Sequence, residues 1–209
     1  MAMVNTHLST MTTYTREATA EQVAEDCKAH ILNRTILITG ATPGGLGAET
    51  AKEISSAAPN VRVHCVELNL ASLSQIQEAA VKIHSFGENI DVVVHNAGVM
   101  APPYSKTVDG IESQFAINHV GHFLLTNLLL PKALARNVPI RVVNVSSGGH
   151  CYHHVCLQDW NFENGKEYNR GHAYAQSKSA NNLFSVALAK KLGDRSPTLS
   201  SFWTLLSIP

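Results

Sequence analysis

Apolar runs suited to β-strands alternate with longer helical stretches along most of the chain. The strand-like runs include VRVHCVEL, IDVVVHNAG and IRVVNVSS, and each is followed by residues with helical character. Repetition of strand and helix predicts parallel βαβ units whose helices cover both faces of one sheet. The segments VVV and VVNV are apolar on both sides, as a strand buried within such a sheet must be. The sequence therefore predicts a doubly wound α/β domain with a parallel sheet.

Length and charge limit the organisation and the partners of this domain. The chain has 209 residues and is 44% apolar, which suits one well-buried domain and is short for two. Residues 1–18 are expected to be loose, and residues 19–209 to form the single domain. Sixteen basic residues balance sixteen acidic ones, so the chain lacks the positive field that nucleic acid or an anionic membrane requires. A small neutral partner fits better.

The N-terminal sequence carries no clear targeting signal. It lacks the basic region and the hydrophobic core of a secretory signal, and no apolar run approaches the roughly 18 residues of a membrane span. These features predict a cytoplasmic protein without a membrane span. Because the first residues are rich in hydroxyls and free of acidic groups, an organelle-transit segment stays open as an alternative. Further along, Thr19 and Gln22 have capping-box spacing and predict a helix to about His30.

A glycine-rich turn follows the first predicted strand, Thr35 to Thr39. In an open parallel sheet, ligands bind beyond the carboxyl ends of the strands, and such a turn lets backbone amides approach a pyrophosphate. A nucleotide-hydrolase loop would need lysine where Leu46 stands, which argues against that class. A purely steric role for the glycines stays open. The glycines of the turn are Gly40, Gly44, Gly45 and Gly47.

Three further motifs follow in order. HNAG at His95 to Gly98 ends one predicted strand, Ser146 and Ser147 end the next, and YAQSK at Tyr174 to Lys178 opens a helix. With TGATPGGLG they resemble the short-chain dehydrogenase/reductase family, whose pattern is TGxxxGxG, NAG, a mid-helix Asn, a Ser and YxxxK. The turn here carries one glycine more than that pattern.

The resemblance extends from about Thr35 to Asp194. Within the family, NHVGHFLLTNLLLP and the long insert between Ser147 and Tyr174 are similar to the retinol-dehydrogenase-like branch. The resemblance implies a Rossmann-like NAD(P)-binding domain. It also implies hydride transfer between a nicotinamide cofactor and the carbonyl or alcohol of a small apolar substrate.

The residues of the last motif explain part of this chemistry. Tyr174 and Lys178 are four apart on a helix and share one face, and a nearby ammonium group favours the phenolate form of a phenol. In the family the tyrosine exchanges a proton with the substrate oxygen, the lysine also holds the nicotinamide ribose, and the serine binds the carbonyl. The resemblance gives the serine role to Ser147. It gives Asn118 the role of securing a water that leads protons to the lysine.

The resemblance also implies a set of cofactor contacts. NADP is expected ahead of NAD, although the strand that decides between them is not recognised in this sequence. Association with further copies of the chain stays open. The run HCYHHVC contains metal-ligating residue types but no second ligand segment, so no metal site is predicted. The implied cofactor residues are Gly40, Gly45, Leu46, Gly47, Asn69, Asn96, Ala97, Gly98, Tyr174 and Lys178.

One strand-plus-helix unit of the family pattern is expected to be missing. The run VRVHCVELNL, with Asn69 near its end, resembles the third strand of the family, so on the order of 25 residues are absent between Gly47 and Val61. Spacing alone suggests instead that Glu67, about 20 residues after Gly47, is the ribose-binding acid. The alignment on Asn69 is preferred. Because unpaired buried backbone is costly, Val61 to Leu68 is then predicted to pair directly and in parallel with the first strand, through a short helix over residues 48–56.

The C-terminal end departs from the family pattern as well. SPTLSSFWTLLSIP lacks the Pro-Gly pair that covers the nicotinamide in the family, and the apolar residues around Phe202 and Trp203 are expected to have no partner. The fold expectation is thus a truncated, Rossmann-like α/β domain, and such a chain is expected to be a poor enzyme. The alternative function is that of an impaired splice form or remnant that only binds nucleotide or self-associates.

Overall fold

The computed structural model describes residues 22, 33–40, 56, 62–136, 140–192 and 200–204, the last five through their backbone alone. The chain divides into two compact units, residues 1–34 and 35–209. Most of the first unit, including the predicted boundary at residue 18, lies outside the described residues, so that boundary stays a prediction. Of the two predicted helices over 19–30 and 48–56, only Gln22 and Ser56 are described, and both are helical.

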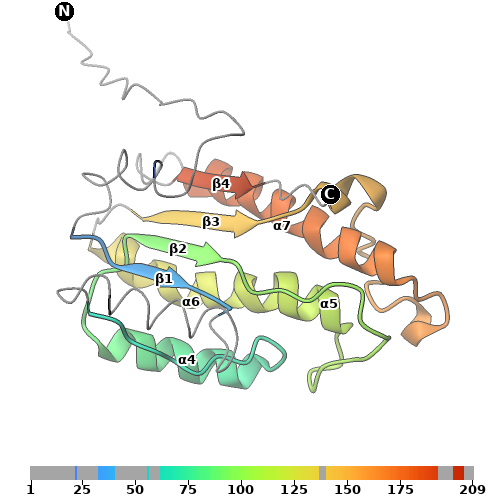
Figure 1. Ribbon diagram of the computed structural model, residues 1–209, viewed down its shortest axis with the longest axis horizontal. Coiled ribbons are helices and arrows are strands. Elements are labelled where there is room, and N and C mark those ends of the chain that lie inside the picture. The colour runs from blue at the N-terminus through green and yellow to red at the C-terminus, as the bar shows by residue number, and fades with distance from the viewer. Residues whose placement is uncertain are drawn as a thin grey trace, which may run out of the picture. The chain divides into compact units, whose positions relative to one another are not determined.

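The second unit is built on a four-stranded parallel sheet. Its strands follow chain order, from the blue β1 to the red β4 of Figure 1. Leu37 on β1 pairs with Val93 on β2, which pairs with Val142 on β3. The predicted parallel, Rossmann-like α/β class is confirmed. The strands are β1 (Ile36–Ile38), β2 (Val92–His95), β3 (Arg141–Val145) and β4 (Ser200–Thr204).

Among the described residues, three long helices connect and cover these strands. Ser72 begins the first of them by accepting a hydrogen bond from the backbone N–H of Gln75. A short π-helical turn precedes the second, and a 3₁₀ turn follows β3. The helices are α4 (Leu73–Ser85), α5 (Ser113–Phe115), α6 (Gly121–Ala135) and α7 (Arg170–Leu192), with the shorter turns η1 (Ala116–Val120), η2 (Gly148–Tyr152) and η3 (Glu163–Gly165).

The described helices cover one face of the sheet. The row formed by Leu37, Val93 and Val142 points into two apolar clusters, one between α4 and α6 and the other between α6 and α7. Side chains alternate along a strand, so the neighbours of Leu37 lie on the opposite face. There Ile36 and Ile38 are 42% and 53% exposed. Apolar burial therefore stabilises the sheet from one side within the described residues.

The predicted pairing of residues 61–68 with β1 is wrong for the described part of that segment. Residues 62–68 form no strand, and the only partner of β1 among the described strands is β2. Val66 and Leu68 instead pack against the apolar cluster between α4 and α6. These two apolar side chains hold the end of the segment on the helices, whereas Val63, earlier in the segment, is 38% exposed. The expected gap between Gly47 and Val61 lies outside the described residues.

The C-terminal segment corrects a second expectation. Residues around Phe202 and Trp203 were expected to be without a partner, but Ser200–Thr204 forms β4 and pairs in parallel with β3. An edge strand finds its partner through backbone hydrogen bonds, which the apolar pattern of the tail does not reveal. No helix within the described ranges is long and apolar enough to cross a membrane.

Replacing Leu125 with alanine is expected to lower the free energy of unfolding by about 2–5 kcal/mol, because the side chain is fully buried on α6 and its loss leaves a cavity. Leu183→Ala on α7 is the matched control, since that leucine is 61% exposed. Urea denaturation measures both variants. Equal destabilisation by the two substitutions would contradict this account of the core.

Candidate active site

Three neighbouring strands end at the same edge of the sheet. Thr39 and Gly40 follow β1, the Asn96–Gly98 turn follows β2, and Ser147 follows β3. The carboxyl end of a parallel sheet is where ligands bind in this class of fold. The structure therefore brings these predicted residues to the edge at which a site is expected.

The two serines after β3 have different partners. The Ser146 hydroxyl donates to the carbonyl oxygen of Lys178, 3.1 Å away, and so fastens the strand end to α7. The Ser147 hydroxyl begins η2 by accepting from the backbone N–H of Gly149 at 3.1 Å. An oxygen that accepts from an amide keeps its own proton to donate. Ser147 is thus the serine with a proton to offer.

Gly149 brings Ser147 and Tyr174 together. A Cβ atom on this glycine would lie 3.2 Å from Cε1 of Tyr174 and 3.4 Å from Oγ of Ser147. The aromatic ring and the hydroxyl therefore flank the same small space, which only a residue without a side chain leaves open. The sequence motifs did not single out this position.

Lys178 lies on the buried side of α7, one turn after Tyr174. Its side chain is 5% exposed, and its Nζ donates to the carbonyl oxygen of Val145 at 3.0 Å. The same nitrogen is 5.6 Å from the centre of the Tyr174 ring. Burial lowers the pKa of Lys178 to about 8. The predicted pairing of these two side chains on one helix face is thus seen in the structure.

Asn118 sits in the π-helical turn η1 and is fully buried. Its side chain accepts from the backbone N–H of Val99 at 2.8 Å and donates to the carbonyl oxygen of Val99 at 2.9 Å. It also donates to the hydroxyl of Ser177, 2.9 Å away. Asn118 therefore ties the loop after β2 to α7. Single π-helical turns often occur at functional sites.

Gly98 lies between the asparagine and the lysine. A Cβ at this position would be 3.0 Å from Oδ1 of Asn118 and 3.8 Å from Nζ of Lys178. Glycine at this position thus allows the backbone of the turn to approach both groups closely. Asn118, Lys178 and the turn after β2 meet at this point.

The turn after β2 is held by Thr39 at the end of β1. The Thr39 hydroxyl oxygen accepts the backbone N–H groups of Asn96 and Ala97, each at 3.1 Å. Gly40 has φ of 103°, a conformation that suits glycine, and a Cβ on it would lie 3.0 Å from Nδ2 of Asn96. The predicted residues Gly40, Asn96 and Ala97 therefore form one contiguous group.

Of the predicted cofactor residues not yet placed, only Asn69 lies within the described residues. Asn69 is exposed, and its side chain accepts from the backbone N–H of Ala71 in the turn that leads into α4. Glu67, the alternative from spacing, is also exposed in the same segment. Gly45, Leu46 and Gly47 lie outside the described residues.

Sequence reasoning missed two buried histidines beside the site. His122 lies between Thr39 and the backbone of Asn118, and burial lowers its pKa to about 4. His95 bonds through Nε2 to the hydroxyl of Thr126 at 2.7 Å, and burial followed by the neighbouring His122 lowers its pKa well below the usual value. Asn118 and His122 are four residues apart on a helix, and this spacing was a signal that could have identified His122 as a neighbour of the site.

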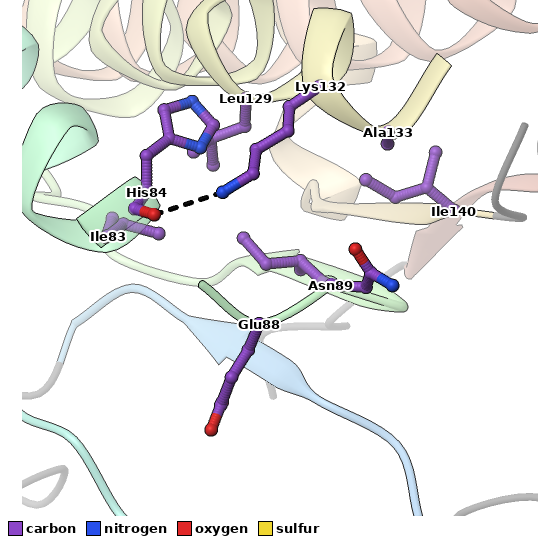
Figure 2. Close-up of a pocket in the computed structure, with 9 residues that line it drawn as sticks. Ile83, His84, Glu88, Asn89, Leu129, Lys132, Ala133 and Ile140 are labelled. Atoms are coloured by element: carbon purple, nitrogen blue, oxygen red, sulfur yellow. Dashed lines mark hydrogen bonds between the residues drawn. The ribbon is translucent and has the colours of Figure 1, made fainter. Parts of the chain in front are cut away.

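Two hollows lie elsewhere. Figure 2 shows the first, where the ammonium group of Lys132 donates to the carbonyl oxygen of His84 at 3.0 Å. This hollow includes Ile90 and Ile140, which precede β2 and β3, so it lies at the amino ends of the strands. The second, of about 460 Å³, is lined by residues 150–155 and by the outer side of α7. Neither hollow is lined by Asn118, Ser147, Tyr174 or Lys178.

Within the part of the chain that the structure describes, no three His, Cys, Asp or Glu side chains gather closely enough to hold a metal ion. His153 in the HCYHHVC run stacks on His154 and contacts His172. These rings pack against one another beside the second hollow.

Comparison with known proteins gives consistent matches. The sequence profile of short chain dehydrogenases matches residues 46–157. Retinol dehydrogenase 13 of Homo sapiens is 38% identical over 198 residues, which cover 83% of this chain and 59% of that protein. Short-chain dehydrogenase TIC 32 A, chloroplastic, of Brassica napus is 36% identical over 208 residues, which cover 86% of this chain and 64% of that protein.

A solved structure also matches. A protein of Mycobacterium paratuberculosis described as uncharacterized aligns with a TM-score of 0.64 and 40% identity, over 80% of this chain and 65% of that chain. The chain thus spans less than two thirds of the length of each of these three proteins.

Gly149→Ala is expected to lower any activity of this site at least about 10-fold with a smaller effect on stability, because the new methyl group presses on the Tyr174 ring. Gly148→Ala is the matched control in the same turn, since its Cβ would meet no atom within 4 Å. Turnover and thermal midpoints of both variants test this. Similar turnover in the two would show that the space beside Tyr174 is unimportant.

The buried histidines predict loss of stability in acid. The pKa of His122 is near 4 in the folded chain and about 6.5 when unfolded, so the unfolded state binds more protons between these values. The contribution of His122 to the free energy of unfolding is complete above about pH 6.5, and it falls by about 3 kcal/mol as the pH approaches 4. Urea denaturation from pH 7 to 4.5 should show a flatter pH dependence for His122→Gln than for His84→Gln. Parallel curves for the two variants would contradict the assignment.

Proposed function

Because the chain belongs to the short-chain dehydrogenase family and resembles its retinol-dehydrogenase-like branch, we propose that it transfers a hydride between a nicotinamide cofactor and a small apolar carbonyl or alcohol. The observation that carries the proposal is that Ser147 and Tyr174 both lie next to Gly149, with Lys178 one helical turn after Tyr174. This gives a proton donor, a second hydroxyl and a cation at the carboxyl edge of a parallel sheet.

The described residues fit a nicotinamide dinucleotide. The ammonium group of Lys178 has three hydrogens and donates one to Val145, which leaves two for the hydroxyls of a ribose. Glycine at position 98 keeps a side chain away from that ammonium group, since a Cβ there would lie 3.8 Å from Nζ. Asn96 and Ala97 form a turn that Thr39 holds in place. When bound, the cofactor supplies or accepts the hydride.

Each catalytic side chain has one task in this proposal. The Tyr174 hydroxyl exchanges a proton with the substrate oxygen, and the Ser147 hydroxyl donates a hydrogen bond to the same oxygen. The Lys178 ammonium group favours the phenolate form of Tyr174 and holds the ribose. Asn118 keeps the loop after β2 against α7 and, by resemblance to the family, secures a water that leads protons to the lysine.

The finer assignments belong to the same proposal. We assign NADP ahead of NAD as the cofactor, with Gly40, Gly45, Leu46, Gly47 and Asn69 completing the binding site. The name of the human relative supports an apolar alcohol or aldehyde as substrate. We also propose a cytoplasmic location, although one relative is named as chloroplastic.

A second candidate function is a module that binds nucleotide or self-associates without turnover. The exposed Ile36 and Ile38 on β1 favour it, because exposed apolar side chains on a strand promote association. Titration with NADPH and NADH, an assay with apolar aldehydes and ketones, and size-exclusion chromatography separate the two candidates. Cofactor binding without turnover would support the module, whereas turnover by a monodisperse chain would reject it.

Tyr174→Phe is expected to abolish turnover while leaving the cofactor dissociation constant within about 3-fold, since it removes a proton donor and little volume. Lys178→Ala should impair both quantities. The matched control is Tyr152→Phe, because Tyr152 is 81% exposed in the neighbouring turn η2. Initial rates and fluorescence titration measure these effects, and undiminished turnover in Tyr174→Phe would reject the assignment.

A further inference from the structure

His122 on α6 contacts both halves of the proposed site, although its side chain is only 2% exposed. Its Nδ1 lies 3.0 Å from the carbonyl oxygen of Asn118, and its Nε2 lies 2.8 Å from Oγ1 of Thr39. Thr39 in turn accepts the backbone N–H groups of Asn96 and Ala97. A single imidazole thus joins the turn that carries Asn118 to the turn that follows β2.

The directions of these hydrogen bonds follow from the chemistry of the partners. A carbonyl oxygen can only accept, so Nδ1 of His122 carries a proton. The Thr39 hydroxyl already accepts two N–H groups and has one proton left, which it donates to Nε2. Both arguments give the same neutral imidazole, protonated at Nδ1. The pKa near 4 agrees with a ring that stays neutral at neutral pH.

The contact with Asn118 occurs where the helix is irregular. In η1 the backbone N–H of Gly121 bonds to the carbonyl oxygen of Ala116, five residues earlier. The imidazole of His122 occupies the carbonyl oxygen of Asn118 within this turn, while the Asn118 side chain binds the backbone of Val99. His122 therefore restrains the backbone of the residue that holds the loop next to Lys178.

We propose that His122 is a positioning residue for hydride transfer that sets the separation between the turn after β2 and the π-helical turn of Asn118. The proposal rests on the function proposed above. Nε2 of His122 holds the turn after β2, on the cofactor side of the site, through Thr39. Nδ1 of His122 holds the π-helical turn, on the proton-transfer side, through Asn118. A shift of about 1 Å between reacting groups costs on the order of 100-fold in rate, so this link is important for turnover.

Three substitutions separate the two contacts. In His122→Asn the amide N–H replaces Nδ1 and keeps the bond to Asn118, whereas in His122→Gln the amide oxygen reaches the place of Nε2 and keeps the bond from Thr39. His122→Phe removes both. We expect the glutamine variant to lose about 10-fold in kcat with an unchanged cofactor KM, and the asparagine variant to show a cofactor KM raised about 10-fold with an unchanged kcat. The phenylalanine variant should show both effects.

The protonated nitrogen gives a test that does not depend on activity. ¹⁵N NMR of histidine-labelled protein should show His122 with its proton on Nδ1. The control variant is His84→Gln, which alters a half-buried histidine bonded to the carbonyl oxygen of Leu128 near the amino ends of the strands. It should change neither kcat nor the cofactor KM. A merely structural role for His122 would lower the thermal midpoint of all three variants and leave the kinetics of the folded fraction alike.

A proton on Nε2 of His122, or indistinguishable kinetics of the asparagine and glutamine variants, would overturn the proposal. If the wild-type chain binds cofactor but transfers no hydride, the proposed function fails on its own. The positioning role is then decided by cofactor dissociation constants, which His122→Asn should raise about 10-fold and His122→Gln should leave unchanged. A chain that binds no cofactor would overturn both proposals, even with the expected tautomer.

Discussion

The parallel register of β1, β2 and β3 determines where Thr39, the Asn96–Gly98 turn and Ser147 lie. Because the strands run in one direction and are in register through Leu37, Val93 and Val142, their ends reach the same edge of the sheet. The same apolar row maintains the register, since a slip of one residue would turn these side chains away from the described helices. The packing of the core therefore also determines the positions of the residues at the strand ends.

Helix α7 combines two kinds of packing along its length. Near the strand ends it buries polar groups, and Lys178, Asn181 and Ser185 each bond to a backbone or side-chain partner. The same helix also buries Phe184 and Leu188 in the apolar cluster over β2 and β3. Buried polar groups are tolerated when they have hydrogen-bond partners, so α7 can bury these three side chains beside its buried alanines, which include Ala173 and Ala175.

Local motifs predicted the residues that meet at the site, since Ser147, Tyr174 and Lys178 lie on elements whose order and direction the sequence reveals. The contacts of His122 could not be predicted, because they depend on which way a helix faces a strand end more than eighty residues away. The predicted strand over 61–68 failed because a short apolar run also suits a segment packed on helices, as Val66 and Leu68 are. The pairing of β4 was missed because backbone hydrogen bonds leave no mark on side-chain pattern.

His95 and His122, whose ring centres lie 4.5 Å apart, are protonated on different nitrogens. The hydroxyl of Thr126 donates to the carbonyl oxygen of His122, so it accepts from Nε2 of His95, while His122 carries its proton on Nδ1. The hydrogen bonds from His95 through Thr126 end on the carbonyl oxygen of His122, and those from Thr39 through His122 end on the carbonyl oxygen of Asn118. A backbone carbonyl oxygen does not pass a proton onward. The two histidines therefore do not relay protons, although histidine side chains often do so in other sites. Any proton that reaches Tyr174 must arrive by a route that avoids these rings.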